Sequence, residues 1–223
     1  MTACPLCGAA PCAPEAPVQG RRYALCGDCG LTFMLPGDRS SAETERTLYD
    51  LHRNDPDDPG YRAFLDRLAQ PLAARLRPGM RGLDYGVGPG PALPTMLAAR
   101  GFPTAAYDPL YAADPVLLRR RYDFIACSET AEHFHDPAAE FARLDDLLRP
   151  GGWLGLMTQW RLPERPFAAW GYARDPTHVC FYQQCTLQWI ARRHRWQLEC
   201  PAPHIALFHK SAAQGMDHGS RLK

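Results

Sequence analysis

Gly82-Leu83-Asp84-Tyr85-Gly86-Val87-Gly88-Pro89-Gly90-Pro91 is the stretch that decides the fold of this chain. It predicts a short buried strand that ends in an acidic residue, followed by a glycine-rich turn and the start of a helix. The glycines allow a sharp turn and leave no Cβ to keep a ligand away from the backbone. Pro91 suits the first turn of a helix, where no N–H donor is needed. The free N–H groups at that helix end favour an anionic or polar ligand.

Two cofactor-binding patterns use such a turn, and spacing separates them. The dinucleotide-binding fingerprint requires G-x-G-x-x-G. Gly86 and Gly88 fit it, but Pro91 stands where the third glycine is needed for close packing of helix on strand. The spacing present, D-x-G-x-G-x-G, resembles motif I of the class I S-adenosylmethionine (SAM)-dependent methyltransferases. Further motifs are needed to distinguish this from an ordinary tight strand-to-helix turn.

Length and composition predict one domain of full size with a small appendage. The 223 residues include 25 basic and 24 acidic ones, and a net charge of +1 gives no global attraction to nucleic acid or acidic membranes. No apolar run approaches the roughly 20 residues that span a bilayer, and the first residues lack a signal-peptide pattern. Nine cysteines, an odd number, argue against a disulfide framework. We therefore expect a cytoplasmic protein without a membrane partner.

Two C-x-x-C-G motifs predict a structural zinc site near the N-terminus. Their four thiolates, those of Cys4, Cys7, Cys26 and Cys29, suit tetrahedral zinc. A redox C-x-x-C would instead be a single pair near a βαβ unit. So short a segment cannot build a core, and the metal would supply most of its folding energy. Residues 1–40 resemble a zinc ribbon, with Cys12 as a spare thiol. The only local basic pair, Arg21-Arg22, gives little support for a nucleic-acid surface.

The rest of the chain divides into three parts. We expect a helical linker over residues 41–60, ending in a turn-rich run from Asn54 to Gly60. The main domain should span residues 61–210 and open with an amphipathic helix from Tyr61 to Arg77. Residues 211–223 are polar and predict a flexible tail.

A second acidic residue marks the end of the next predicted strand. Phe102 to Tyr107 reads as a strand that runs into Asp108. A carboxylate at this point, beside the glycine turn, can accept both hydroxyls of a ribose. The alternative is an aspartate that merely forms a turn before Pro109. Residues 109–121 are too few for the helix, strand and helix that the family usually has here, so we expect a trimmed sheet edge and identify no adenine contact.

The most specific resemblance lies around Tyr122 to Pro137. A buried strand from Tyr122 to Glu129 runs into an E-x-x-E-H … D-P sequence that is similar to the family's fourth-strand motif. The following L-R-P-G-G-W-L run, with a strand expected over Trp153 to Thr158, also resembles the family. The resemblance implies an α/β fold with a doubly wound, mostly parallel sheet of the Rossmann-like class I methyltransferase kind. It also implies SAM as cofactor, with contacts from Asp84, Tyr85, Gly86, Gly88, Gly90, Asp108, Pro109, Cys127, Ser128 and Glu129.

Candidate catalytic residues lie in and near an aromatic-rich insertion over residues 159–185. By position it should cover the carboxyl ends of the strands, where open α/β sheets bind ligands. Methyl transfer from a sulfonium needs mainly alignment, with a general base if the acceptor is a hydroxyl or a carbon acid. His178, in a run resembling D-x-T-H-V of one branch of the family, is the first candidate and His133 the second. The alternative is that Glu129, Glu132 and His133 hold a divalent metal.

Three functions remain open at this point. The first is a methyltransferase acting on a small molecule through an oxygen, nitrogen or carbon atom. The second is an RNA or protein methyltransferase that uses the zinc ribbon as a docking module. The third is a non-catalytic SAM-binding or zinc-dependent interaction protein. The oligomeric state is not predicted.

Overall fold

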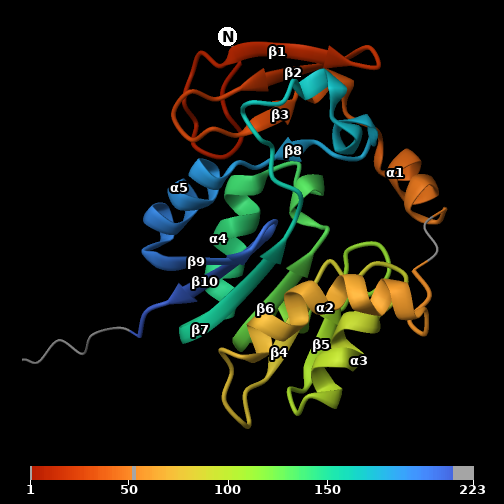
Figure 1. Cartoon of the computed structure of the whole chain (residues 1–223), viewed down its shortest axis with the longest axis vertical. Coiled ribbons are helices and arrows are strands. Elements are labelled where there is room, and N and C mark those ends of the chain that lie inside the picture. Colours follow the sequence, from red (N-terminus) through yellow and green to blue (C-terminus); the bar gives the residue numbers. More distant parts are fainter. Residues whose placement is uncertain (1, 52–53, 213–223) are drawn as a thin grey trace, which may run out of the picture.

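The computed structural model describes residues 2–51 and 54–212 (Figure 1). The tail predicted over residues 211–223 therefore lies, from residue 213 onward, outside the described residues. Within the described ranges, no helix combines the length and the apolar character needed to cross a membrane.

The main domain is built on a six-stranded sheet in the order β5-β4-β6-β7-β10-β9. Its strands are β4 (Gly82–Tyr85), β5 (Thr104–Tyr107), β6 (Tyr122–Ser128), β7 (Leu148–Met157), β9 (Trp196–Ala202) and β10 (Ile205–Lys210). The first four are parallel to one another, whereas β10 pairs antiparallel with both β7 and β9. The predicted mostly parallel, doubly wound α/β sheet is confirmed.

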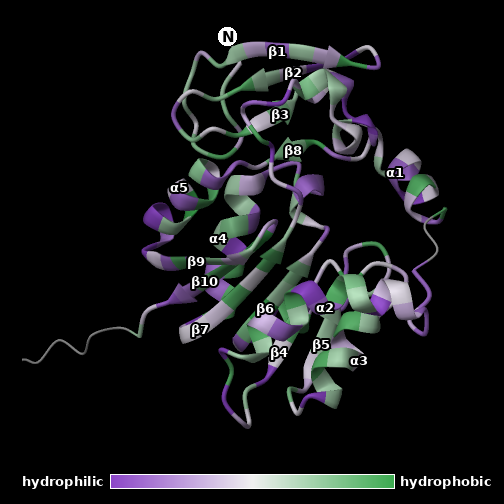
Figure 2. Ribbon diagram, in the orientation of Figure 1, coloured by the Kyte–Doolittle hydropathy of each residue, from purple (hydrophilic) through white to green (hydrophobic). Residues whose placement is uncertain are grey.

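Helices cover both faces of this sheet (Figure 1). They are α2 (Pro59–Ala73), α3 (Ala92–Ala99), α4 (Pro137–Leu147) and α5 (Gln184–His194). Successive side chains of a strand point to opposite faces. Accordingly, Phe124 packs in the cluster of α2 and α3, whereas Ile125 packs in the cluster of α4 and α5. Burial on both faces explains why β6 reads as a continuous apolar run. The short helix α3 is predominantly hydrophobic (Figure 2).

Three element boundaries differ from the sequence expectation for local reasons. Helix α2 begins at Pro59, because Asp58 Oδ1 accepts a hydrogen bond from Tyr61 N at 2.6 Å and caps the helix. Pro91 is the N-cap of α3 and not its first residue. Strand β7 starts at Leu148, earlier than the expected Trp153, because Leu148 already pairs with β6 across a register shift.

The sheet edge beyond β5 is short, as expected. Between Asp108 and β6 the structure has a 3₁₀ turn, η2 (Leu117–Arg119), and an isolated bridge between Asp108 and Ala112. Strand β5 is consequently the edge strand of the sheet as described.

A second, four-stranded sheet forms at the N-terminus in the order β1-β2-β3-β8. Its antiparallel strands are β1 (Ala13–Val18), β2 (Arg21–Leu25), β3 (Thr32–Met34) and β8 (Cys180–Phe181). The strand β8 comes from the aromatic insertion, which also contains η4 (Phe167–Ala169) and η5 (Gly171–Arg174). Sequence reasoning predicted neither β1 nor the pairing of β3 with β8. This pairing fastens the N-terminal sheet to the main domain (Figure 1).

Side chains reinforce that attachment. The ring of Tyr23 packs edge-on against Phe167, with centroids 5.0 Å apart. Arg161 donates a hydrogen bond to Thr32 Oγ1 at 2.5 Å and forms a salt bridge with Glu15. One hydrophobic cluster runs from the N-terminal sheet to α4 and α5. The core of residues 1–40 is therefore continuous with that of the main domain.

Candidate functional site

The glycine turn after β4 is held open for a ligand by its own backbone. The N–H of Gly86 donates to Tyr107 O at 2.8 Å, which fixes the turn beside the end of β5. Gly86 and Gly88 have φ angles of +86° and +64°, in the left-handed region that favours glycine. A Cβ added at Gly88 would meet nothing within 4 Å. The backbone at Gly88 thus faces open space, as close approach of a ligand requires.

Two carboxylates flank this turn at the ends of neighbouring parallel strands. Asp108 Oδ2 accepts from Gly88 N at 3.0 Å, and Oδ1 accepts from the backbone N–H groups of Leu110 and Tyr111 at 2.8 and 3.1 Å. A carboxylate has about four acceptor sites, so these three bonds leave one for a ligand hydroxyl. Asp84 is 3% exposed. Burial, with the nearby charge of Asp108, raises the pKa of Asp84 to about 8.

Asp84→Asn should stabilise the cofactor-free protein in a pH-dependent way. Because the folded-state pKa of about 8 lies above the unfolded value of about 3.9, wild-type stability falls as pH rises between these values. The melting temperature of Asp84→Asn should therefore exceed that of wild type increasingly from pH 5 to pH 8. Differential scanning calorimetry across this range measures the difference.

Asp123→Asn is the matched control. Burial opposes ionisation of Asp123, but the Arg81 N–H and the Arg149 guanidinium outweigh it, and the net effect lowers its pKa. This variant should be less stable than wild type at neutral pH and should approach it in acid. If Asp84→Asn instead melts with the pH profile of wild type, Asp84 does not bear the burial cost that we assign to it.

The E-x-x-E-H segment lies directly beside the glycine turn. Thr130 Oγ1 is 3.1 Å from Gly86 O and 2.9 Å from Ser128 O, so its hydroxyl ties the end of β6 to the turn after β4. A Cβ at Gly86 would lie 2.1 Å from Thr130 Cγ2. Glu129 adopts a φ of +46°, and its N–H donates to Met157 O at 2.8 Å. The chain thus turns sharply at Glu129, at the carboxyl end of the sheet.

Among the other residues predicted to contact the cofactor, some side chains are free to bind a ligand and others are not. Ser128 Oγ is buried and has no hydrogen-bond partner among the described residues, which suits a ligand contact. Cys127 is fully buried, and burial raises the pKa of its thiol well above the usual value. Tyr85 donates its hydroxyl proton to Glu140 and stacks on Tyr107. The side chains of Cys127 and Tyr85 are therefore engaged in the core, and a cofactor contact from either would involve the backbone.

Tyr172 of the insertion reaches the end of the sheet and joins two glutamates. Its hydroxyl lies 2.5 Å from Glu132 Oε1, 3.3 Å from Glu129 Oε2 and 3.2 Å from Thr158 Oγ1. Glu132 is fully buried. Burial, followed by the charge of Glu132, raises the pKa of Glu129 to about 8. The insertion thus covers the carboxyl ends of β6 and β7, where the sequence placed it.

The two histidines predicted as catalytic are neighbours. Their ring centroids lie 4.8 Å apart. The Nδ1 atom of His178 is 2.8 Å from Tyr172 O, and the Nδ1 atom of His133 is 2.9 Å from Thr177 O. A carbonyl oxygen accepts only from N–H, so both Nδ1 atoms carry the proton and both Nε2 atoms keep a lone pair. Burial lowers the pKa of His178, which favours the neutral ring.

Helix α1 (Ala42–Tyr49), Asp50 and Asn54 lie against this site, which sequence reasoning missed. The Tyr49 hydroxyl lies 3.0 Å from His133 Nδ1, and Tyr111 donates to Asp50 Oδ1 at 2.7 Å. A Cβ at Gly90 would lie 2.0 Å from Asn54 O. Only a glycine at position 90 therefore leaves room for the backbone of Asn54. The region predicted as a linker therefore contacts both ends of the site. Its polar sequence and lack of buried residues gave no signal of these contacts.

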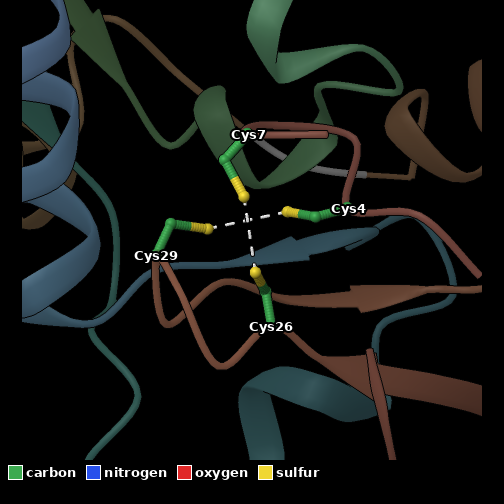
Figure 3. Close-up of side chains that lie close together, drawn as sticks. All are labelled: Cys4, Cys7, Cys26 and Cys29. Carbon is green, nitrogen blue, oxygen red and sulfur yellow. Dashed lines mark hydrogen bonds between the residues drawn. The ribbon is translucent and has the colours of Figure 1, made fainter. Parts of the chain in front are cut away.

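The four predicted zinc ligands converge on a common centre (Figure 3). The Sγ atoms of Cys4 and Cys29 are 3.6 Å apart, and those of Cys7 and Cys26 are 3.4 Å apart. Sulfurs on tetrahedral zinc at a Zn–S distance of about 2.3 Å lie about 3.8 Å apart, so the donor set fits this metal. Cys12 is not part of the cluster.

The two C-x-x-C-G motifs have the same backbone geometry. Gly8 N donates to Cys4 O and Gly30 N to Cys26 O, both at 3.0 Å. Both glycines have positive φ angles, +78° and +75°. The two matching turns present their thiolates from opposite sides of the centre.

Comparison with known proteins agrees with this geometry. A family model described as a methyltransferase domain matches residues 58–211, more than half of the chain. The chain therefore belongs to this family, and it is a SAM-dependent methyltransferase with the class I Rossmann-like fold. A search of curated proteins finds no match.

Solved structures with the same fold are distant in sequence. The 1,6-didemethyltoxoflavin-N1-methyltransferase of Burkholderia thailandensis, with bound 1,6-didemethyltoxoflavin and S-adenosylhomocysteine, matches with a TM-score of 0.53 and 16% identity over 89% of this chain and 99% of that chain. The sugar N-methyltransferase KedS8 of Streptoalloteichus sp. ATCC 53650 has a TM-score of 0.51 and 14% identity over 77% and 94%. DesVI of Streptomyces venezuelae has a TM-score of 0.50 and 14% identity over 78% and 100%.

Proposed function

We propose that this protein transfers the methyl group of SAM to a small-molecule acceptor bound beneath the aromatic insertion. The observation that carries the proposal is the adjacency of two sites: the Gly86–Gly88 turn and the Tyr172–His178 cluster, which Thr130 and Glu129 join. Two of the neighbouring structures are a 1,6-didemethyltoxoflavin-N1-methyltransferase and a sugar N-methyltransferase. The net charge of the whole chain is +1, which gives no global attraction to nucleic acid.

The residues around the turn fit the cofactor. Asp108 keeps an acceptor site for a ribose hydroxyl, and the space over Gly88 admits close approach of a ligand. Asp84 makes no hydrogen bond with its carboxylate within the described part of the chain, so it is available to a cationic group of the ligand. When bound, SAM supplies a methyl group already activated by the sulfonium. Residues 84–90, Asp108, Ser128 and Glu129 would hold and orient it, and Tyr172 would help to exclude water from the acceptor side.

In this function the N-terminal segment is a structural zinc ribbon that stabilises the insertion through strand pairing. We propose that Cys4, Cys7, Cys26 and Cys29 bind zinc, on the strength of their tetrahedral spacing. Strand β8 begins two residues after His178 and pairs with β3 of the ribbon. A folded ribbon therefore helps to fix the position of His178. Because β3 pairs within the chain, it is not a free edge for a docking partner. The nine free cysteines also fit the reducing cytoplasm that we propose as the location.

Transfer of an isotopically labelled methyl group from SAM into a pool of small metabolites tests the proposal. Label should appear in a low-molecular-weight product. Label recovered instead in RNA or protein would overturn the choice of acceptor class. No turnover with any pool, despite SAM binding, would favour the non-catalytic alternative.

His178→Ala should lower the methyl-transfer rate by about 100-fold while changing the dissociation constant of S-adenosylhomocysteine by less than threefold. The reason is position, since His178 belongs to the insertion, where its Nδ1 lies 2.8 Å from Tyr172 O, and not to the glycine turn. Steady-state kinetics and calorimetry measure the two quantities. Cys12→Ala, outside both sites, is the control. A large loss of cofactor affinity in His178→Ala would contradict the assignment of His178 to the acceptor side.

A further inference from the structure

A buried carboxylate and two histidines form a second candidate metal centre, separate from the cysteine cluster. One donor atom from each of Glu132, His133 and His178 lies within 4.8 Å of the others. Glu132 and His133 follow β6, whereas His178 comes from the insertion, so the fold brings together side chains that are distant in sequence. The sequence suggested a metal only as an alternative, with Glu129 in place of His178.

One carboxylate oxygen of Glu132 has no hydrogen-bond partner among the described residues, which indicates a ligand-binding role. Glu132 is 0% exposed. Its Oε1 accepts from Tyr172, but its Oε2 has no hydrogen-bond partner among the described residues. An unpaired oxygen of a buried carboxylate is costly. A cation bound to this oxygen would remove the cost.

The histidines are oriented as metal ligands usually are. In metal sites the second ring nitrogen of a ligating histidine donates to a carbonyl or carboxylate, which fixes the tautomer and turns the other lone pair to the metal. His133 and His178 both make such a bond, from Nδ1 to Thr177 O and Tyr172 O. The Nε2 atom of His133 lies 4.0 Å from Glu132 Oε1.

We propose that Glu132, His133 and His178 bind a divalent transition-metal cation such as Mn²⁺, Fe²⁺ or Zn²⁺. Two imidazoles and one carboxylate suit these ions better than Mg²⁺ or Ca²⁺, which prefer all-oxygen sites. Ligands on tetrahedral zinc at about 2.1 Å are about 3.4 Å apart, so the donors move modestly inward on binding. Tyr172 holds Glu132, and Asp175, 3.8 Å from His178 Nε2, lies beside the site.

Three protein ligands leave coordination positions open. The centre sits on the loop that Thr130 ties to the glycine turn, under the insertion. An acceptor with an oxygen donor, such as a hydroxyl or a carboxylate, fits these positions. This consequence for the substrate rests on the proposed function, whereas the metal site itself does not. In this arrangement the histidines act on the acceptor through the cation and not directly as bases.

Titration of Mn²⁺ into protein that already holds one equivalent of zinc tests the proposal. Mn²⁺ has low affinity for thiolate sites and does not displace their zinc. We expect one Mn²⁺ per chain, detected by calorimetry and by electron paramagnetic resonance. Glu132→Gln and His178→Gln should each weaken Mn²⁺ binding at least tenfold. His135→Gln should bind it as wild type does, because His135 lies at the surface and pairs with Glu45.

S-adenosylhomocysteine binding is measured on the same samples and separates the outcomes. Unchanged binding of S-adenosylhomocysteine in Glu132→Gln and His178→Gln shows that these variants are folded. The metal proposal is overturned if the wild type takes up no Mn²⁺, as expected of a purely structural cluster, or if these two variants bind Mn²⁺ normally. If Mn²⁺ binds but S-adenosylhomocysteine does not, the metal site stands and the proposed function fails.

Discussion

Cys26→Ser should release the zinc and lower the melting temperature of the whole protein by roughly 10 °C, since loss of a metal site costs about 4 kcal/mol or more. Cys26 is 1% exposed, and its thiol lies 3.4 Å from that of Cys7. The ribbon shares a continuous hydrophobic cluster with α4 and α5, so its loss exposes apolar surface of the main domain as well. Zinc content by atomic spectroscopy and melting by calorimetry measure the two effects.

The same variant should also lose methyl transfer. Without the ribbon, β8 loses its only strand partner in the described structure, and the chain just before β8 carries His178. Cys12→Ser is the matched control, because Cys12 lies in the same segment but outside the cluster. Burial raises the pKa of the Cys12 thiol to about 12, which keeps it protonated. Full zinc content in Cys26→Ser, or equal destabilisation in Cys12→Ser, would contradict the zinc assignment.

Asp108→Ala should weaken S-adenosylhomocysteine binding by about 150-fold, the equivalent of about 3 kcal/mol for a hydrogen bond to a charged group. The variant removes the acceptor offered to the ribose. It also removes the carboxylate that holds Gly88 N at 3.0 Å, so the turn loses part of its preorganisation. Calorimetry gives the affinity.

Asp114→Ala serves as the control for this prediction. Asp114 also forms a local turn, in which Oδ1 accepts from Val116 N at 2.9 Å, but it is exposed and lies away from the glycine turn. It should bind S-adenosylhomocysteine as wild type does. Affinity within threefold of wild type in Asp108→Ala would mean that Asp108 is only a turn-forming residue, the alternative that the sequence left open.

Local patterns predicted the sheet and its cofactor edge well. The glycine spacing after β4, the apolar run of β6 and the Asp136-Pro137 helix start each depend on residues close together in the chain, and each is present in the structure. The trimmed edge after Asp108 was also predictable, because residues 109–121 are too few for more elements.

Contacts between distant segments could not be predicted in this way. The adjacency of His133 and His178 depends on how the insertion folds back over β6, and no local pattern encodes that path. The pairing of β3 with β8 involves only two residues of β8, too short for a strand signal. The site contact of Tyr49 comes from a polar helix with no buried residues. Tertiary packing decides each of these features.

The glycine turn and Asp108 should bind SAM and not a dinucleotide. Calorimetric titration of the zinc-loaded protein with S-adenosylhomocysteine, with NAD as the control ligand, measures this selectivity. We expect binding of one S-adenosylhomocysteine per chain and none of NAD. Binding of NAD, or no binding of S-adenosylhomocysteine, would contradict the assignment of this site to SAM.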